Sequence, residues 1–100
     1  MQANTQKPTL SIHGRRWFQR TYGNTYHSVK VSIDGKEVFT VPFEYGYGDG
    51  YLQTAVDGLK ERGLLPGNAR YGTLYLREES GYQFDYSVTD VERKRDLHQA

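Results

Sequence analysis

Residues 49–64, DGYLQTAVDGLKERGL, carry the pattern that decides the fold class. Apolar side chains recur in this stretch three and four residues apart, which places them on one side of a helix. They are Leu52, Ala55, Val56 and Leu59. Asp49 stands where an N-cap is expected, and Gly63 followed by Leu64 is typical of a helix end. Gly58 inside the helix costs about 1 kcal/mol relative to alanine, which indicates close packing against a strand.

The chain before this helix alternates apolar and polar residues in the manner of strands. Gly23-Asn24 predicts a two-residue turn, because both residues tolerate positive φ, and this turn pairs Tyr22 with Thr25. On the core side the resulting pairs are Phe18–Val29, Arg20–His27 and Arg16–Val31. On the outer side they are Trp17–Lys30, Thr21–Tyr26 and Arg15–Ser32. Because an arginine is out of place in a core, either Gly14 forms a bulge or Arg16 emerges at the sheet edge.

A third strand follows the turn signal Asp34-Gly35. A strict two-residue loop would pair Val31 with Val38. We favour a loop with one extra residue, which pairs Val31 with Phe39 and Val29 with Val41. That choice places three apolar residues of this strand on one side, namely Phe39, Val41 and Phe43.

Two further strands are predicted after the helix, around residues 71–76 and 82–88. A hairpin loop at Glu79-Ser80-Gly81 would pair Leu76 with Phe84 and Leu74 with Tyr86. The expected fold is therefore α+β, an antiparallel sheet of about five strands in the order β-β-β-α-β-β with one helix packed on one face. The expected organisation is a flexible tail at 1–8, one domain at 9–90 and a polar C-terminal tail at 91–100.

Composition narrows the class of protein. One hundred residues with 36% hydrophobic content fit one small domain whose core relies on aromatic residues, nine of them tyrosines. The chain has no cysteine, which excludes a disulfide scaffold and a thiolate metal site. No apolar run is long enough for a membrane span or a signal peptide, so we expect a soluble cytoplasmic protein without membrane partners.

Charge is distributed unevenly along the chain. Residues 1–30 carry five basic residues and no acidic one, whereas residues 31–100 carry eight basic and twelve acidic residues. The five are Lys7, Arg15, Arg16, Arg20 and Lys30. Such an asymmetry favours a polyanionic or acidic partner for the basic half, unless folding interleaves the two halves into a mixed surface.

The candidate contact surface is the outer face of the first hairpin. It combines cations with flat rings, which suits single-stranded nucleic acid, since cations follow phosphates and rings stack on bases. The binding residues predicted there are Arg15, Trp17, Tyr26, Lys30 and Arg20, together with Tyr45 and Tyr47 of the loop before the helix. An acidic protein surface would suit the same residues. A cation–π pair of Trp17 with Lys30 that only stiffens the hairpin is the structural alternative.

The loop at 44–51, EYGYGDGY, is rich in glycine and opens a helix. Its spacing is G-x-G-x-G rather than G-x-G-x-x-G, it lacks a Walker-type lysine, and Asp49 adds negative charge. These features argue against a nucleotide site. The loop either packs on the sheet or presents its tyrosines to a partner.

Catalysis has few candidate residues here. His13, His27 and Lys30 could form a ribonuclease-like acid–base set, but the predicted register separates the two histidines. Metal-ligand spacing is absent, and no cofactor motif is present. We therefore expect a protein that is not an enzyme and that has no metal and no cofactor.

Three segments resemble a family of small proteins found in phage and prophage genomes, most of them without an assigned function. They are Arg15-Arg16-Trp17-Phe18, Gly23-Asn24-Thr25-Tyr26-His27-Ser28-Val29 and Tyr45-Gly46-Tyr47-Gly48. The resemblance spans about residues 10–60 and transfers no residue roles. It implies an accessory protein of a phage or mobile element in the cytoplasm of a bacterial host, where such proteins bind host proteins or nucleic acid.

These observations lead to one functional hypothesis and one alternative. The hypothesis is a small non-enzymatic module that contacts nucleic acid, or a nucleic-acid-binding complex, through its first hairpin. The alternative is a protein-binding inhibitor of a host factor, such as a defence system, or a self-associating structural module in which an open sheet edge pairs with a second copy.

Overall fold

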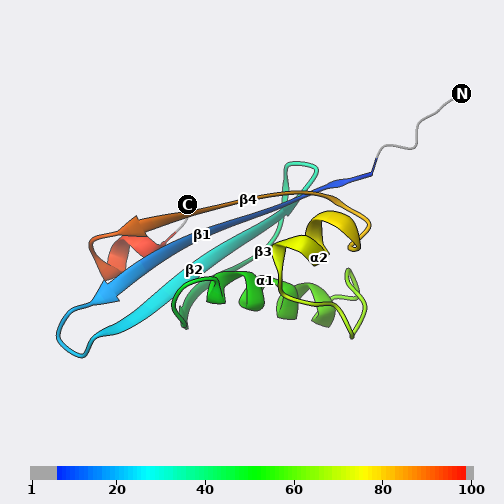
Figure 1. The fold of residues 1–100 in the computed structure, drawn as a ribbon. Coiled ribbons are helices and arrows are strands. Elements are labelled where there is room, and N and C mark those ends of the chain that lie inside the picture. Colours follow the sequence, from blue (N-terminus) through cyan, green and yellow to red (C-terminus); the bar gives the residue numbers. More distant parts are fainter. Residues whose placement is uncertain (1–6, 99–100) are drawn as a thin grey trace, which may run out of the picture.

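The computed structural model describes residues 7–98. These residues form four strands, two α-helices and a short 3₁₀ helix (Figure 1). In chain order they are β1 (Thr9–Gln19), β2 (Asn24–Ile33), β3 (Lys36–Tyr45), α1 (Gly50–Glu61), α2 (Thr73–Glu78), β4 (Gln83–Val91) and η1 (Lys94–Leu97).

One sheet of order β3-β2-β1-β4 organises the domain. β1, β2 and β3 are antiparallel, whereas β4 lies parallel to β1. α1 and α2 lie on one side of the sheet, and η1 follows β4 at the end of the sheet where β1 finishes (Figure 1). The α+β class is confirmed. The prediction of five antiparallel strands is wrong, because the sheet has four strands and is mixed.

The missing strand is the segment predicted at 71–76, where the structure has α2. Its sequence TLYLRE consists largely of good helix formers, and Leu76 is its one buried residue. Leu74, which the alternating pattern assigned to the core, is 63% exposed. The predicted pairs of Leu76 with Phe84 and Leu74 with Tyr86 are therefore wrong, and β4 pairs with β1 instead. A short alternation of apolar and polar residues does not distinguish a strand from a short helix.

The predicted main helix is confirmed as α1. Its buried residues are Tyr51, Leu52, Ala55, Val56 and Leu59. At its end the Gly63 amide donates to the Lys60 carbonyl and the Leu64 amide to the Leu59 carbonyl, the two bonds of a Schellman motif. Asp49 occupies the N-cap position without a side-chain capping bond. A Cβ on Gly58 would lie 2.6 Å from Phe39 Cε2, so the predicted close approach to a strand is also correct.

The register of the first hairpin differs from the prediction. Gln19 pairs with Asn24, so the turn consists of residues 20–23 rather than Gly23-Asn24. Gly23 closes this turn with φ 72°, and its amide donates to the Gln19 carbonyl. The predicted partners are therefore wrong: Trp17 lies opposite Tyr26, Arg16 opposite His27, and Lys30 opposite His13. The register moves by four, an even number, so the predicted division of side chains between the two faces survives.

The second hairpin has the predicted pairing but a different turn. Asp34 and Gly35 form a strict two-residue turn with φ values of 52° and 81°. A register irregularity between Val31 and Ser32 then brings Val31 opposite Phe39. The same pairing therefore arises from an extra residue within the strand and not within the loop.

A second irregularity in β3 moves Phe43 to the outer face. Val29 pairs with Val41 and His27 with Glu44, so Pro42 and Phe43 together lie opposite Ser28. Proline has no amide hydrogen to donate to the ladder and is tolerated at such a bulge. The prediction that Phe43 shares a face with Phe39 and Val41 is wrong for this reason.

Gly14 lies where α1 approaches the sheet closely. A Cβ at this position would lie 2.6 Å from Tyr51 Cδ2. No register shift occurs at Gly14 in either neighbouring pair, so it allows a close contact and is not a bulge. Arg16, two residues further along, lies beyond the start of α1, where its charge does not enter the core. The Nε of Arg16 donates to Asp90 Oδ1 at 2.8 Å, and Asp90 is the residue of β4 that lies opposite Arg16.

The C-terminal segment covers part of the outer face. Leu97 in η1 is buried, and the buried Ser28 hydroxyl donates to the Leu97 carbonyl. Arg15 Nη1 donates to the carbonyls of Asp96 at 3.0 Å and His98 at 2.7 Å. In the tail predicted at 91–100, Val91 is the last residue of β4, and residues 96–98 pack against β1 and β2. Residues 99–100 lie outside the described residues. Most of the predicted N-terminal tail, residues 1–6, lies outside the described residues. No helix in the described part of the chain is long and apolar enough to cross a membrane.

Candidate functional site

A cluster of four aromatic rings crosses three strands on the outer face, on the side of the sheet away from α1. We call Trp17, Tyr26, Phe43 and Tyr45 the aromatic platform. Tyr26 is at its centre, stacked on Phe43 with ring centroids 4.8 Å apart and on Trp17 at 5.8 Å. The ring of Tyr45 meets Tyr26 edge-on at 5.6 Å. The platform is thus a continuous row from β1 to β3.

Sheet register builds the platform. Trp17, Tyr26 and Tyr45 lie directly opposite one another on adjacent strands. The bulge at Pro42 adds Phe43 to the same face, so that two neighbouring rings of β3 contact the one ring of β2. The cluster depends on the four-residue turn, since the predicted register would have placed Tyr26 opposite Thr21.

The platform is half-buried at its centre and at its β1 end, and exposed at its β3 end. Trp17 and Tyr26 are half-buried, whereas Phe43 is 42% and Tyr45 61% exposed. Lys94 of η1 places its Nζ 4.9 Å from the centroid of the Phe43 ring. A cation over the ring stabilises it and puts a positive charge at the β3 end of the platform.

The hairpin residues that are predicted to bind do not lie in one cluster. Trp17 and Tyr26 are in contact. Arg15 shares their face, but its guanidinium holds η1 in place. Lys30 lies further along β2, opposite His13. The predicted pair of Trp17 and Lys30 is therefore not formed.

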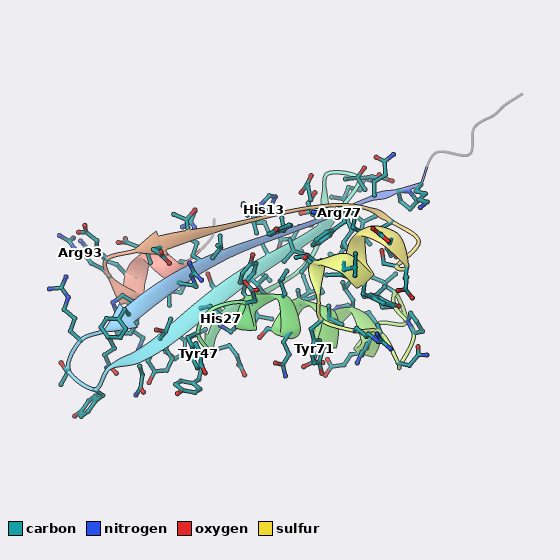
Figure 2. All side chains as sticks on the ribbon, viewed as in Figure 1. His13, His27, Tyr47, Tyr71, Arg77 and Arg93 are labelled. Carbon is teal, nitrogen blue, oxygen red and sulfur yellow. The ribbon has the colours of Figure 1, made fainter. Side chains whose placement is uncertain are left out.

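An open hollow of about 650 Å³ continues from the platform around the end of the sheet. It lies between the β1–β2 turn and the residues after β4, and Trp17 is part of its lining. Arg20 and Arg93 contribute the positive charge and Glu92 the negative charge of this lining. Figure 2 shows Arg93 at the end of the molecule where η1 lies.

The tyrosine-rich loop is anchored at its glycines, and Tyr45 and Tyr47 are exposed, whereas Tyr51 is buried. The Gly46 amide donates to the Thr25 carbonyl, and Arg16 Nη1 donates to the Gly48 carbonyl at 3.0 Å. Tyr47 is 75% exposed, on the α1 side of the sheet (Figure 2). The loop backbone therefore packs on the sheet, which is one of the two alternatives, while presentation of its exposed tyrosines to a partner stays a prediction. Tyr45 belongs to the platform, and Tyr47 does not.

His27 is buried and fixes the same loop. Its Nδ1 lies 3.1 Å from the Gly46 carbonyl oxygen and its Nε2 2.8 Å from the Thr54 hydroxyl. Because a carbonyl only accepts, Nδ1 carries the proton and donates to Gly46, and Nε2 accepts from Thr54. Both ring nitrogens of His27 thus have structural partners.

The two histidines of the conceivable acid–base pair lie on opposite faces of the sheet (Figure 2). His13 has its Nδ1 2.7 Å from the Ser87 hydroxyl on the outer face, whereas His27 lies beneath the loop on the α1 face. Among residues 7–98 no group of three or more histidine, cysteine or acidic side chains is arranged to hold a metal ion.

Folding partly interleaves the charges of the two halves of the chain. Arg16 pairs with Asp90, and Arg15 is held by the segment that contains Asp96. The same C-terminal segment adds three cations to the basic N-terminal half: Arg93, Lys94 and Arg95. The end of the sheet where β1 and β4 finish is therefore rich in both cations and anions. Its cations come from both the N-terminal and the C-terminal part of the chain.

Two residues of the site, Phe43 and Lys94, are not predicted from the sequence. Phe43 was assigned to the core because the bulge at Pro42 was not recognised, although a proline inside a strand is a signal for one. Lys94 lies in the expected tail, whose apolar residues are Val91, Leu97 and Ala100, and the burial of Leu97 is seen only in the structure. Comparisons with protein-family models, curated proteins and solved structures found no match to this chain.

Proposed function

We propose that this protein is a non-enzymatic module that binds single-stranded nucleic acid on its aromatic platform. The observation that carries the proposal is the row of stacked rings across β1, β2 and β3, with Phe43 and Tyr45 exposed beside Lys94. Sheet faces that carry exposed rings and nearby cations stack bases and attract phosphates.

The geometry favours single strands over duplexes. A ring can stack on a base only when that base is free of its own neighbours, as in single-stranded loops and ends. The described helices offer no obvious candidate for entering a major groove, since α1 packs its apolar side on the sheet and α2 is six residues long. Bases would lie on the platform, and the backbone would run toward Arg20 and Arg93 in the adjoining hollow.

Fluorescence anisotropy with labelled single-stranded oligonucleotides tests the proposal. Three cations along the path, Lys94, Arg20 and Arg93, predict a slope of about −2 for the logarithm of affinity against the logarithm of salt concentration. Tyr45→Ala should weaken binding about tenfold, because base–aromatic stacking contributes about 1–3 kcal/mol per base. Tyr71→Ala is the matched control, since this exposed tyrosine lies near α1 (Figure 2).

Lys94→Ala tests the electrostatic part separately. This variant should reduce the salt slope by about 0.7 for one lost phosphate contact. Lys36→Ala, at the start of β3, should leave the slope unchanged. Absence of binding to single-stranded DNA and RNA at low salt would end the proposal and favour a protein partner. The resemblance to phage proteins stays a prediction, under which the nucleic acid would be that of a phage or its host.

A further inference from the structure

The outer edge of β4 differs from the outer edge of β3 at the opposite border of the sheet. Among the strands of residues 7–98, β4 has β1 as its one neighbour in the sheet (Figure 1). Its nine residues, QFDYSVTDV, include no proline and no lysine or arginine, and its pairing with β1 shows no register shift. The β3 edge has Pro42, two register irregularities and charged residues at both ends. Natural sheets use such devices to prevent edge pairing, and β4 lacks the proline and the register irregularities of β3, although it carries Asp85 and Asp90.

Backbone direction determines which residues of β4 offer their hydrogen bonds outward. The Gln83 amide donates to the Pro8 carbonyl, on the β1 side. The amide and carbonyl of one strand residue point to the same side, and successive residues alternate. Odd-numbered residues of β4 therefore bond to β1, and even-numbered residues present their backbone groups at the free edge. The outward residues are Phe84, Tyr86, Val88 and Asp90.

We propose that this edge pairs antiparallel with the β4 edge of a second copy, about a two-fold axis at Tyr86. The outward residues must face one another to exchange hydrogen bonds, so the axis passes through a residue and not between two. Three registers satisfy this condition near the middle of the strand, with the axis at Asp85, Tyr86 or Ser87.

Side-chain pairing selects among these three registers. An axis at Asp85 places two carboxylates directly opposite each other, which is unfavourable. An axis at Ser87 places the ring of Phe84 opposite the carboxylate of Asp90. The axis at Tyr86 pairs Phe84 with Val88 of the partner and Tyr86 with itself, and it places Asp85 opposite serine. Phe84 and Tyr86 already stack at 5.3 Å, so this register extends one apolar row across the axis.

The resulting dimer would have one continuous sheet of eight strands. A two-fold axis perpendicular to the sheet keeps both aromatic platforms on the same face and places them at opposite ends of the joined sheet. The dimer does not depend on the proposed binding of nucleic acid, because the platform and the β4 edge are separate surfaces.

Tyr86 offers a direct test, since the proposed axis places it opposite its own copy. Light scattering after size exclusion should give twice the mass of the chain for the natural protein. Tyr86→Lys and Tyr86→Glu should each give the mass of a monomer, because like charges then face each other across the axis. An equimolar mixture of the two variants should restore the dimer. Circular dichroism establishes that each variant is folded.

Thr89→Lys is the matched control, because the proposed register places this residue opposite Gln83 of the partner. This variant should stay dimeric although it adds the same charge to the same strand. A monomeric natural protein at millimolar concentration would overturn the proposal. A dimer that persists in Tyr86→Lys, or a mixture of the two variants that stays monomeric, would overturn the assigned edge and axis.

Discussion

Trp17 and Tyr26 lie directly opposite each other on β1 and β2, with ring centroids 5.8 Å apart and ring planes inclined by 27°. This contact connects the first hairpin to the rings of β3, because Tyr26 also contacts Phe43 and Tyr45. Tyr26 therefore holds the other three rings in place.

Replacing Tyr26 by alanine should reduce the free energy of unfolding by about 2 kcal/mol. The change removes three aromatic contacts, each contributing about 0.5–1.5 kcal/mol, from a half-buried side chain. Urea denaturation measures the loss. Tyr22→Ala, in the β1–β2 turn and 75% exposed, should change stability by less than about 0.5 kcal/mol. Equal losses in the two variants would contradict a central role for Tyr26.

Gly58→Ala should destabilise the protein although alanine favours helices. The new Cβ would lie 2.6 Å from Phe39 Cε2, and this ring is confined by Arg62, whose guanidinium carbon lies 4.2 Å from the ring centroid. Overpacking of this kind costs about 1–3 kcal/mol, against a propensity gain of about 1 kcal/mol. The thermal midpoint should fall. Adding Phe39→Leu to Gly58→Ala should recover part of the loss, and no recovery would contradict the steric explanation.

Thr54→Val should loosen the tyrosine-rich loop. The hydroxyl of Thr54 donates to His27 Nε2 at 2.8 Å, and valine would leave this buried nitrogen without its donor at a cost of about 1–3 kcal/mol. Hydrogen exchange at the Gly46 amide, which donates to the Thr25 carbonyl, should accelerate. Gln53→Ala, on the exposed side of α1, is the control. Unchanged exchange in Thr54→Val would show that His27 does not hold the loop.

Alkaline pH should destabilise the fold through Tyr51. Burial raises the pKa of the Tyr51 phenol above its usual 10.0, and the negative charges of Asp49 and ionised Tyr86 raise it further, although Arg16 acts in the opposite direction. The neutral phenol is therefore favoured in the folded state. Its contribution to stability is complete below pH 10.0 and is lost as the pH rises through the higher folded pKa.

Tyr51→Phe should reduce this alkaline loss, since phenylalanine retains the buried ring and has no proton to lose. Urea denaturation of both proteins at a series of pH values above neutrality measures the difference. Parallel stability curves for the two proteins would show that the alkaline loss arises elsewhere.

The features predicted correctly from sequence depend on local patterns. The stripe of α1, the close approach at Gly58 and the division of β1 and β2 residues between two faces all follow from periodicity. Periodicity is also insensitive to an even shift in register, which is why Trp17 and Tyr26 were placed on the correct face but given wrong partners.

The features that were missed depend on contacts between distant parts of the chain. β4 joins β1 in parallel, across more than sixty residues, because the Thr73–Glu78 segment forms a helix and cannot be its hairpin partner. Arg15 was interpreted as a contact residue, and only the fold shows that it binds the carbonyls of Asp96 and His98. Side-chain chemistry alone does not distinguish these two roles for an arginine.

The fluorescence of Trp17 tests the central claim most directly. It is the sole tryptophan of the chain and belongs to the platform and to the lining of the adjoining hollow, so its emission reports on these two adjacent surfaces. Titration with single-stranded oligonucleotide should quench this emission with the same midpoint as the anisotropy change, and added salt should reverse both. Binding detected by anisotropy while Trp17 emission stays constant to saturation would contradict the platform as the site.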